Sequence, residues 1–236
     1  MIDQKVLMTD VSVDCVVFGY HEDQLKALLI EQKYPDGSSN ETPRYALPGD
    51  LVFENEDLDE AASRVLKELT SIELENAYLE QLYAFGSPNR VKDVKDQEWL
   101  RLFRKNPDAR VITIAYYSLV KMEDYDPKAS SFANKAQWLN VNEIPDLAFD
   151  HNQILAYALH VIREQIKDHP VGFHLLPKKF TLGQLQHLNE VILNEKLDKR
   201  NFRRKVQKID AVQPLDEKQQ GVLHKPARYY TYVEKR

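Results

Sequence analysis

Apolar and polar positions follow a pattern that predicts an α/β domain over the first two thirds of the chain. Strands are predicted at "VSVDCVVFGY" and "LKALLIEQK", with the polar turn "HEDQ" between them. Further strands are predicted at "RYALPG", "YLEQLYAFGSP", "RVITIAYYSLV" and "AQWLNVNEIP". The helical spacing of "DHNQILAYALHVIREQIKDH" predicts a long amphipathic helix that closes this domain.

The stretch "LPGDLVFENEDLDEAASRVLKELTSIE", residues 47–73, predicts a loop followed by a second amphipathic helix. Asp57 is the predicted N-cap, and Glu60, three residues later, completes a capping box. The apolar positions at helical spacing then form one buried face, made of Leu58, Ala61, Val65 and Leu69.

Residues 91–105, "VKDVKDQEWLRLFRK", predict an additional short helix between two strands. Its apolar side is expected to be Val94, Trp99, Leu102 and Phe103. Two interpretations stay open for this segment. The aromatic residue tucks a loop onto the body of the domain, or the segment is a lid over a pocket and Trp99 forms part of a binding face.

The last third of the chain predicts two helices in tandem. Thr181 caps the first helix with Gln184 as its capping-box partner, and its buried stripe is Leu182, Leu185, Leu188 and Ile192. Asp198 caps the second helix, in which Phe202, Val206 and Ile209 face the core. The opposite surface of that helix carries Lys199, Arg200, Asn201, Arg203, Arg204, Lys205 and Lys208.

A helix with this basic face suits the major groove of DNA or the surface of an anionic membrane. The partner helix before it favours DNA, and so does the strand–loop–strand pattern of "QPLDEKQQGVLHKPARYYTYVEKR" after it. The domain is therefore predicted to be a winged helix-turn-helix. The predicted DNA-binding residues are Thr181, Gln184, Lys199, Arg200, Asn201, Arg203, Arg204, Lys205, Lys225 and Arg228.

The net charge of the chain changes sign at the start of its last third, where the winged helix-turn-helix is predicted. Residues 170–236 contain 14 Lys/Arg and 7 Asp/Glu, a net charge of +7, whereas residues 1–169 contain 18 and 30, a net charge of −12. We therefore predict two domains, at residues 1–169 and 170–236. With no predicted membrane span or signal peptide, and with Cys15 as its one cysteine, the protein is expected to be cytoplasmic and free of intrachain disulfides.

Residues 50–72 resemble the Nudix box, a family motif of glycine, arginine and glutamates at fixed spacing. The pattern is kept at Glu56, Arg64, Leu66, Glu68 and Ile72, and it is broken at Asp50, Val65, Leu69 and Ser71. The resemblance implies a Nudix-like α/β/α sandwich for the first domain. In active members of the family, three carboxylates at the positions of residues 65, 68 and 69 hold magnesium against a substrate diphosphate.

Those three positions share one helix face, but here Glu68 stands between Val65 and Leu69. Magnesium prefers several hard oxygen ligands, so this face is a poor magnesium site. We therefore predict no catalytic residue, no metal and no cofactor. The prediction is a Nudix fold that binds a ligand without cleaving it, and a residual Nudix hydrolase is the alternative from a different class.

The two halves together resemble the NrtR-type Nudix-related transcriptional regulators. The segments that carry the resemblance are "FTLGQLQHLNEVIL", "LDKRNFRRK" and "KPARYY". It implies a homodimeric repressor that binds double-stranded operator DNA and is released by a small-molecule effector. The family's effectors are ADP-ribose, in regulators of NAD metabolism, and sugars, in a branch that responds to L-arabinose. The chain is expected to belong to the arabinose branch and to control carbohydrate use, with ADP-ribose as the alternative.

Four residues are predicted to bind the effector from their positions in the Nudix frame: Asp14, Tyr45, Arg90 and Trp99. Asp14 is the most distinctive, because a carboxylate inside an apolar strand is costly to bury without a partner. Its other interpretation is a structural hydrogen bond within the domain, and the sequence leaves both open.

Overall fold

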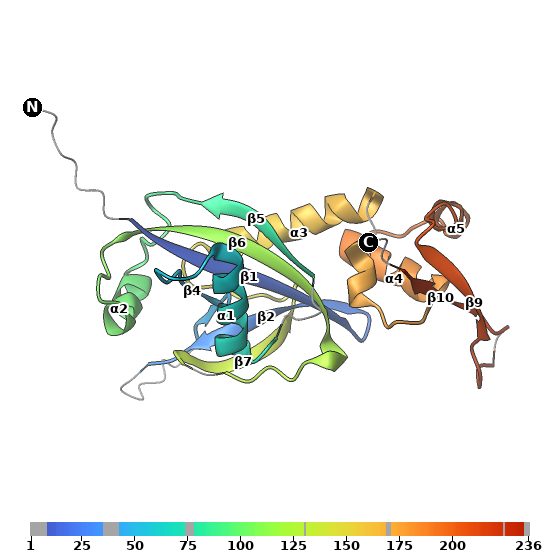
Figure 1. The fold of residues 1–236 in the computed structure, drawn as a ribbon, viewed down its shortest axis with the longest axis horizontal. Helices are drawn as coiled ribbons and strands as arrows, with labels where there is room; N and C mark the ends of the chain where they lie inside the picture. The colour runs from blue at the N-terminus through green and yellow to red at the C-terminus, as the bar shows by residue number, and fades with distance from the viewer. Residues whose placement is uncertain are drawn as a thin grey trace, which may run out of the picture.

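The computed structural model describes residues 9–34, 43–73, 78–129, 131–168, 171–223 and 225–233. Within these residues the N-terminal domain is a mixed sheet with one long helix on each face (Figure 1). Its strands are β1 (Thr9–His21), β2 (Gln24–Gln32), β3 (Tyr45–Ala46), β4 (Gly49–Leu51), β5 (Tyr78–Phe85), β6 (Arg110–Lys121) and β7 (Ala133–Asn140).

The sheet runs in the order β3-β2-β1-β6-β5, with β4 paired to β1 and β7 paired to β2. The β1–β6 pair is parallel and the others are antiparallel. A tight turn joins β1 to β2, and both of its central residues, Glu22 and Asp23, have positive φ. The strands predicted from the sequence are therefore confirmed.

Helix α1 (Leu58–Thr70) covers one face of the sheet and α3 (His151–Asp168) covers the other (Figure 1). The predicted capping box of α1 is present, because Asp57 accepts from the Glu60 N–H and Glu60 accepts from the Asp57 N–H. Two apolar clusters fill the layers: one lies under α1, and the other runs from α3 into the C-terminal domain. This arrangement confirms the predicted sandwich.

Helix α2 (Val94–Phe103) forms as expected and buries Trp99 as predicted, but the other three residues of its predicted apolar side are exposed. Val94 is 64% exposed and Leu102 is 53% exposed, whereas Asp96, Trp99 and Leu100 are buried. The buried face therefore includes a carboxylate, which the apolar pattern could not reveal. Short 3-10 helices occur at η1 (Met122–Asp124) and η2 (Val171–Leu175).

The C-terminal domain consists of α4 (Leu182–Leu193), α5 (Lys199–Val206) and a three-stranded sheet, β8-β10-β9. Its strands are β8 (Phe180–Thr181), β9 (Val212–Lys218) and β10 (Arg228–Tyr232). The predicted stripe of α4 is buried, and β9 and β10 form the predicted wing. The predicted boundary between residues 169 and 170 lies outside the described residues. Within the described part of the chain, no helix is both long and apolar enough to cross a membrane.

Candidate functional site

Arg64 of α1 joins the box loop to the box helix. Its guanidinium donates two hydrogen bonds to Glu56, at 2.8 and 2.7 Å, and one to the Leu51 carbonyl at 2.8 Å. The guanidinium carbon lies 3.8 Å from the centre of the Phe53 ring. These hydrogen bonds lower the pKa of Glu56 and raise that of Arg64. Two of the three charged residues that this chain keeps from the motif, Glu56 and Arg64, therefore hold the loop in place.

Two of the three positions that would carry metal ligands hold apolar side chains that face the core. Val65 and Leu69 are buried in the apolar cluster beneath α1. Glu68 is half exposed and pairs with Arg64 at 3.2 Å, as does Asp50 at 3.4 Å. Among the described residues, no three His, Cys, Asp or Glu side chains are grouped as metal ligands. The residues present therefore do not fit a magnesium site.

A cavity of about 850 Å³ lies beside the box, between β1, β2, β4 and α2. Its size falls near the upper end of the usual range for small-molecule sites. One wall is aromatic and contains Trp99, Phe103, Phe132 and Phe149. The basic side chains that line it are Lys33, Arg90, Arg104 and Lys105. A ligand with a flat ring and a negative charge would match this lining.

Asp14 and Arg90 belong to a buried charge network at this cavity. Arg90 is 3.3 Å from Asp14 and makes a two-point contact with Asp150, at 3.0 and 2.8 Å. Burial would raise the pKa of Asp14, but the N–H group of His151 that faces the carboxylate and the charged guanidinium of Arg90 hold that pKa below its ordinary value. A side chain at Gly49, opposite Asp14 in the sheet, would collide with this carboxylate.

His151 is the first residue of α3 and completes the network. Its Nδ1 accepts a hydrogen bond from the Leu47 N–H at 2.9 Å, so the ring proton lies on Nε2, 3.5 Å from Asp14 Oδ1. Burial lowers the pKa of His151, which keeps the ring neutral. Both interpretations of Asp14 therefore find support, because its carboxylate lines the cavity and is also bound within the domain.

Helix α2 closes one side of the cavity and is tied down at two points. Asp96 accepts hydrogen bonds from Arg44 and, at 2.9 Å, from the Phe149 N–H, and burial raises the pKa of Asp96. The Trp99 ring N–H donates to the Lys33 carbonyl at 3.1 Å. Trp99 therefore tucks the segment onto the body and also presents its ring to the cavity.

Tyr45 differs from the other three residues predicted to bind the effector. Asp14, Arg90 and Trp99 line the same cavity, but Tyr45 packs against the apolar cluster under α3 and is not among the described lining residues. Alternation along β3 explains the difference, because neighbouring Ala46 reaches the cavity instead. Sequence reasoning missed Gln32, Arg104 and His151, which line the cavity and carry no motif signal.

The second candidate site is the outer face of α5. Lys199, Arg200, Asn201, Arg203 and Arg204 are exposed, whereas Val206 is buried. Asp198 caps the helix by accepting from the Asn201 N–H at 2.8 Å, as predicted. Phe202 is half-buried on the inner side, so the basic residues form a continuous outward surface.

Lys205 and Arg228 are less available than the sequence suggested. The Lys205 ammonium donates to the Lys167 carbonyl at the end of α3. Arg228 donates to the Leu215 carbonyl at 2.7 Å and to Asp216 at 2.9 Å, which joins the two strands of the wing. Lys225 is exposed in the wing loop.

Thr181 and Gln184 have a structural role at the start of α4. The Thr181 hydroxyl accepts from the Gln184 N–H at 3.2 Å, and the Gln184 side chain accepts from the Thr181 N–H at 2.8 Å. Thr181 is 4% exposed, so its side chain does not face DNA in this structure. Gln184 is exposed, but it lies in a hollow against the β1–β2 turn of the first domain.

The fold and these sites define the class of protein: a Nudix domain joined to a DNA-binding winged helix. The chain matches the NUDIX domain over residues 8–159, and residues 172–232 match the NrtR DNA-binding winged helix domain. The chain therefore belongs to the Nudix family, and its second domain is of the NrtR type.

Three known proteins are similar to this chain, two of them in sequence and one in its crystal structure. The chain is 28% identical to the ADPR responsive transcriptional repressor NtrR of Acinetobacter baylyi, over 94% of this chain and 81% of that protein. It is 30% identical to the ADP-ribose pyrophosphatase of Methanocaldococcus jannaschii, over 59% of this chain and 69% of that protein. The crystal structure of Shewanella oneidensis NrtR matches with a TM-score of 0.68 at 25% identity, covering 94% of both chains.

Proposed function

We propose that this protein is a transcriptional repressor that binds operator DNA through its winged helix and releases the DNA when ADP-ribose occupies the Nudix cavity. The observation that carries the proposal is the similarity to an ADPR responsive transcriptional repressor, because it extends over 94% of the chain and includes both domains. The absence of two of the three metal-ligand carboxylates from α1 agrees with a domain that senses its ligand and leaves it intact.

The cavity supports ADP-ribose over a free pentose. A volume of about 850 Å³ is large for a single sugar ring, and the aromatic wall offers a surface for a nucleobase. Four basic side chains line the space, although the N-terminal domain is acidic overall. The similar proteins give no support to the prediction that L-arabinose is the effector. L-Arabinose is therefore included among the ligands in the unfolding experiment described below.

The outer face of α5 is the proposed DNA-reading surface. Five exposed side chains follow one side of this short helix, and cations in that arrangement contact phosphates and base edges in the major groove. Lys225 extends the positive surface from the wing. Arg228 holds the wing strands together, so it supports the surface from behind.

A residual hydrolase is the second candidate, and the observation that favours it is the 30% identity to an ADP-ribose pyrophosphatase. The geometry of α1 weighs against it. Val65 and Leu69 are buried in hydrocarbon, and the Glu68 carboxylate is engaged by Arg64. A single carboxylate in this state does not supply the ligand set that magnesium-dependent attack on phosphorus requires.

We also propose that the repressor acts as a homodimer that joins through the edge strand β5. Tyr83 of β5 and Tyr157 of α3 are 53% and 38% exposed, and their ring centres lie 5.2 Å apart, with Phe85 beside both. β5 is the last strand in the sheet order, so one of its edges has no strand partner among the described residues. An exposed aromatic patch next to a free edge suits a second copy of the chain, whose two winged helices would then occupy two half-sites.

Helix α3 provides the physical connection between cavity and winged helix. Its first residue, His151, lines the cavity, and its eighteen residues span about 27 Å. Near its far end, Arg163 donates to the Ile192 carbonyl of α4 at 2.8 Å, and the Lys167 carbonyl accepts from Lys205 of α5. A ligand that moves the start of α3 therefore shifts both helices of the DNA-binding domain.

Thermal unfolding with a panel of ligands tests the effector. A ligand that binds only the folded protein raises its melting temperature by mass action. We expect ADP-ribose to raise it and L-arabinose to leave it unchanged, and ADP-ribose to release a duplex selected for binding from a random pool. A rise with L-arabinose alone would replace the proposed effector by a sugar.

A further inference from the structure

Gln32, the last residue of β2, has a buried side-chain amide that makes no hydrogen bond within the described part of the chain. It is 4% exposed, and neither its Nε2 nor its Oε1 has a partner among the residues that the structure describes. Leaving such a group unsatisfied costs folding free energy, so a buried orphan in a native protein calls for an explanation. Gln32 lines the cavity, so a bound ligand can supply the missing donor and acceptor.

The surroundings of Gln32 indicate what kind of group that ligand presents. The carbonyl of the next residue, Lys33, accepts from the Trp99 ring N–H, and the Lys33 N–H donates to the Phe132 carbonyl at 3.0 Å. Gln32 therefore lies beside the aromatic wall of the cavity. A flat ring that stacks on this wall and offers a donor and an acceptor on its edge is a nucleobase, and adenine has both.

Arg104, the residue that caps the C-terminal end of α2, also lines the cavity, and it is partly buried there. Among the described residues its guanidinium donates no hydrogen bond. Burial lowers the pKa of Arg104 despite the nearby charges of Asp14 and Asp50. A partly desolvated guanidinium without a bound partner is a site prepared for an anion.

The carboxylates in the same lining do not fill that role. Asp14 is paired with Arg90, and both Asp50 and Glu68 are paired with Arg64. Each of these carboxylates therefore has an ion-pair partner other than Arg104 among the described residues, and the Arg104 guanidinium is left for the ligand. A guanidinium binds phosphate oxygens through two parallel hydrogen bonds, and it needs none of the metal ligands that α1 lacks.

We propose that Arg104 binds the diphosphate of the effector in place of a metal ion, and that Gln32 reads the edge of its adenine against the aromatic wall. This inference rests on the proposed function and assigns the parts of ADP-ribose to residues of this chain. It implies that the effector binds with full affinity in the absence of magnesium.

Titration calorimetry of the full-length protein with ADP-ribose tests the assignment, with EDTA in one buffer and magnesium in the other. We expect the same affinity in both. Arg104→Ala should weaken binding about 10- to 100-fold and flatten its dependence on salt concentration. Gln32→Leu should weaken binding roughly 5- to 20-fold and keep the salt dependence of the wild type. Arg101→Ala, an exposed arginine of the same helix, is the matched control and should bind as the wild type does.

Melting temperatures of the unliganded variants separate a binding role from a structural one. Neither side chain forms a hydrogen bond with the described residues of the unliganded fold, so Gln32→Leu and Arg104→Ala should melt at or above the temperature of the wild type. A clear decrease would assign the residue to the fold and overturn its role in binding. Wild-type protein that binds only with magnesium, or variants that bind as tightly as the wild type, would overturn this inference alone. Wild-type protein that binds no ADP-ribose in either buffer would overturn the proposed effector as well.

Discussion

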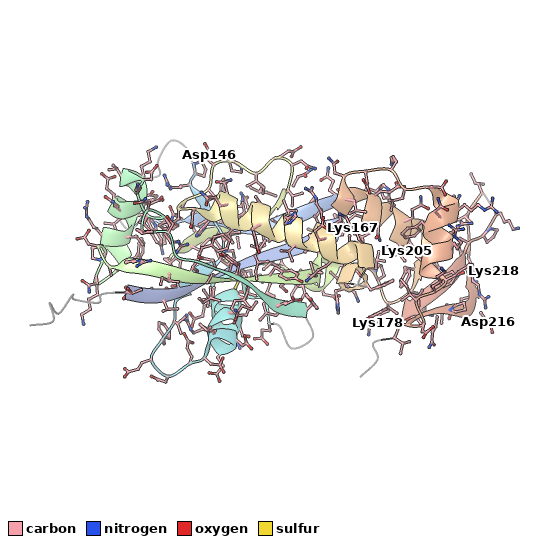
Figure 2. All side chains as sticks on the ribbon, turned by 90° about the horizontal axis from the view of Figure 1, so that it is seen from above. Asp146, Lys167, Lys178, Lys205, Asp216 and Lys218 are labelled. Atoms are coloured by element: carbon pink, nitrogen blue, oxygen red, sulfur yellow. The ribbon has the colours of Figure 1, made fainter. Side chains whose placement is uncertain are left out.

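The side chain of Lys205 in α5 donates a hydrogen bond to the backbone carbonyl of Lys167, one residue before the end of α3 (Figure 2). The exposed carbonyls at the end of a helix carry partial negative charge, which favours an ammonium group there. The link joins the helix that starts at the Nudix cavity to the helix proposed to read DNA. A residue expected to contact DNA is thereby also a connection between the two domains.

Removing that connection should uncouple the two sites. Coupling between effector and operator is reciprocal and typically amounts to about 1–3 kcal/mol. We expect Lys205→Met to bind ADP-ribose normally, whereas saturating operator should weaken that binding less than in the wild type. Titration with and without operator measures both values. Lys208→Met, an exposed lysine just beyond α5, should keep the wild-type coupling. If the wild type and both variants showed equal coupling, Lys205 would not transmit the signal between the two sites.

The basic face of α5 should carry the salt-dependent part of DNA binding. Arg203→Ala or Arg204→Ala should weaken operator binding and reduce the slope of log K against log salt by about 0.9 for each phosphate that the variant no longer neutralises. ADP-ribose binding should not change, because the cavity lies at the other end of α3. Fluorescence anisotropy at several salt concentrations gives the slopes. A variant with an unchanged slope would mean that its arginine does not bind a phosphate.

Restoring the missing carboxylates should damage the fold before it restores catalysis. Val65→Glu and Leu69→Glu place ionisable groups where the wild-type side chains are 0% and 2% exposed. Each should lower the free energy of unfolding by about 3 kcal/mol or more, as measured by urea denaturation. Ser63→Glu adds the same group at an exposed position of α1 and should have little effect. The wild type should release no AMP from ADP-ribose and magnesium; turnover at an enzymatic rate would establish the hydrolase instead.

Stability should fall as the pH falls below the ordinary pKa of histidine. Burial lowers the pKa of His151 below 6.5, so the unfolded chain binds a proton that the folded chain does not. Between 6.5 and the lowered value, the free energy of unfolding should decrease by up to about 1.4 kcal/mol per pH unit. His151→Gln keeps an acceptor for the Leu47 N–H and should lose this part of the slope. Urea denaturation between about pH 5 and pH 7 gives the free energy of unfolding of the wild type and of His151→Gln. If this free energy changed with pH equally in both proteins, the ring of His151 would not be buried in its neutral form.

The patch of Tyr83 and Tyr157 should determine the oligomeric state. The double change Tyr83→Lys with Tyr157→Lys places like charges at the proposed contact between two copies. We expect a dimer for the wild type and a monomer for the variant in sedimentation equilibrium, with weaker operator binding and normal ADP-ribose binding. Val94→Lys alters another exposed apolar residue and should remain dimeric. A wild-type monomer at all concentrations would end this proposal.

Local signals were the most predictable part of the molecule. The capping boxes at Asp57 with Glu60 and at Thr181 with Gln184 depend on residues three apart, and both are present. The apolar faces of α1 and α4 follow from helical spacing alone. The sequence could therefore supply the elements, their order and the two domain types.

Long-range partners explain where prediction failed. The buried side of α2 includes Asp96 because Arg44, 52 residues earlier in the chain, neutralises it, and no local pattern reports that pair. Tyr45 lies on the face of β3 opposite to the one predicted, and a two-residue strand gives too short an alternation to predict its direction. Gln32 and Arg104 stand out only because their hydrogen-bonding groups have no partner in the described part of the chain, and this property emerges only in the folded molecule.

The placement of the two sites at opposite ends of α3 has a consequence for how such regulators diverge. Substitutions in the wall formed by α2 and β2 change which small molecule is recognised, while the outer surface of α5 stays as it was (Figure 1). Changes on α5 likewise alter the recognised operator without reshaping the cavity. Mutation can therefore act on the two specificities separately, and one architecture can be recruited to new metabolites while it continues to govern the same genes.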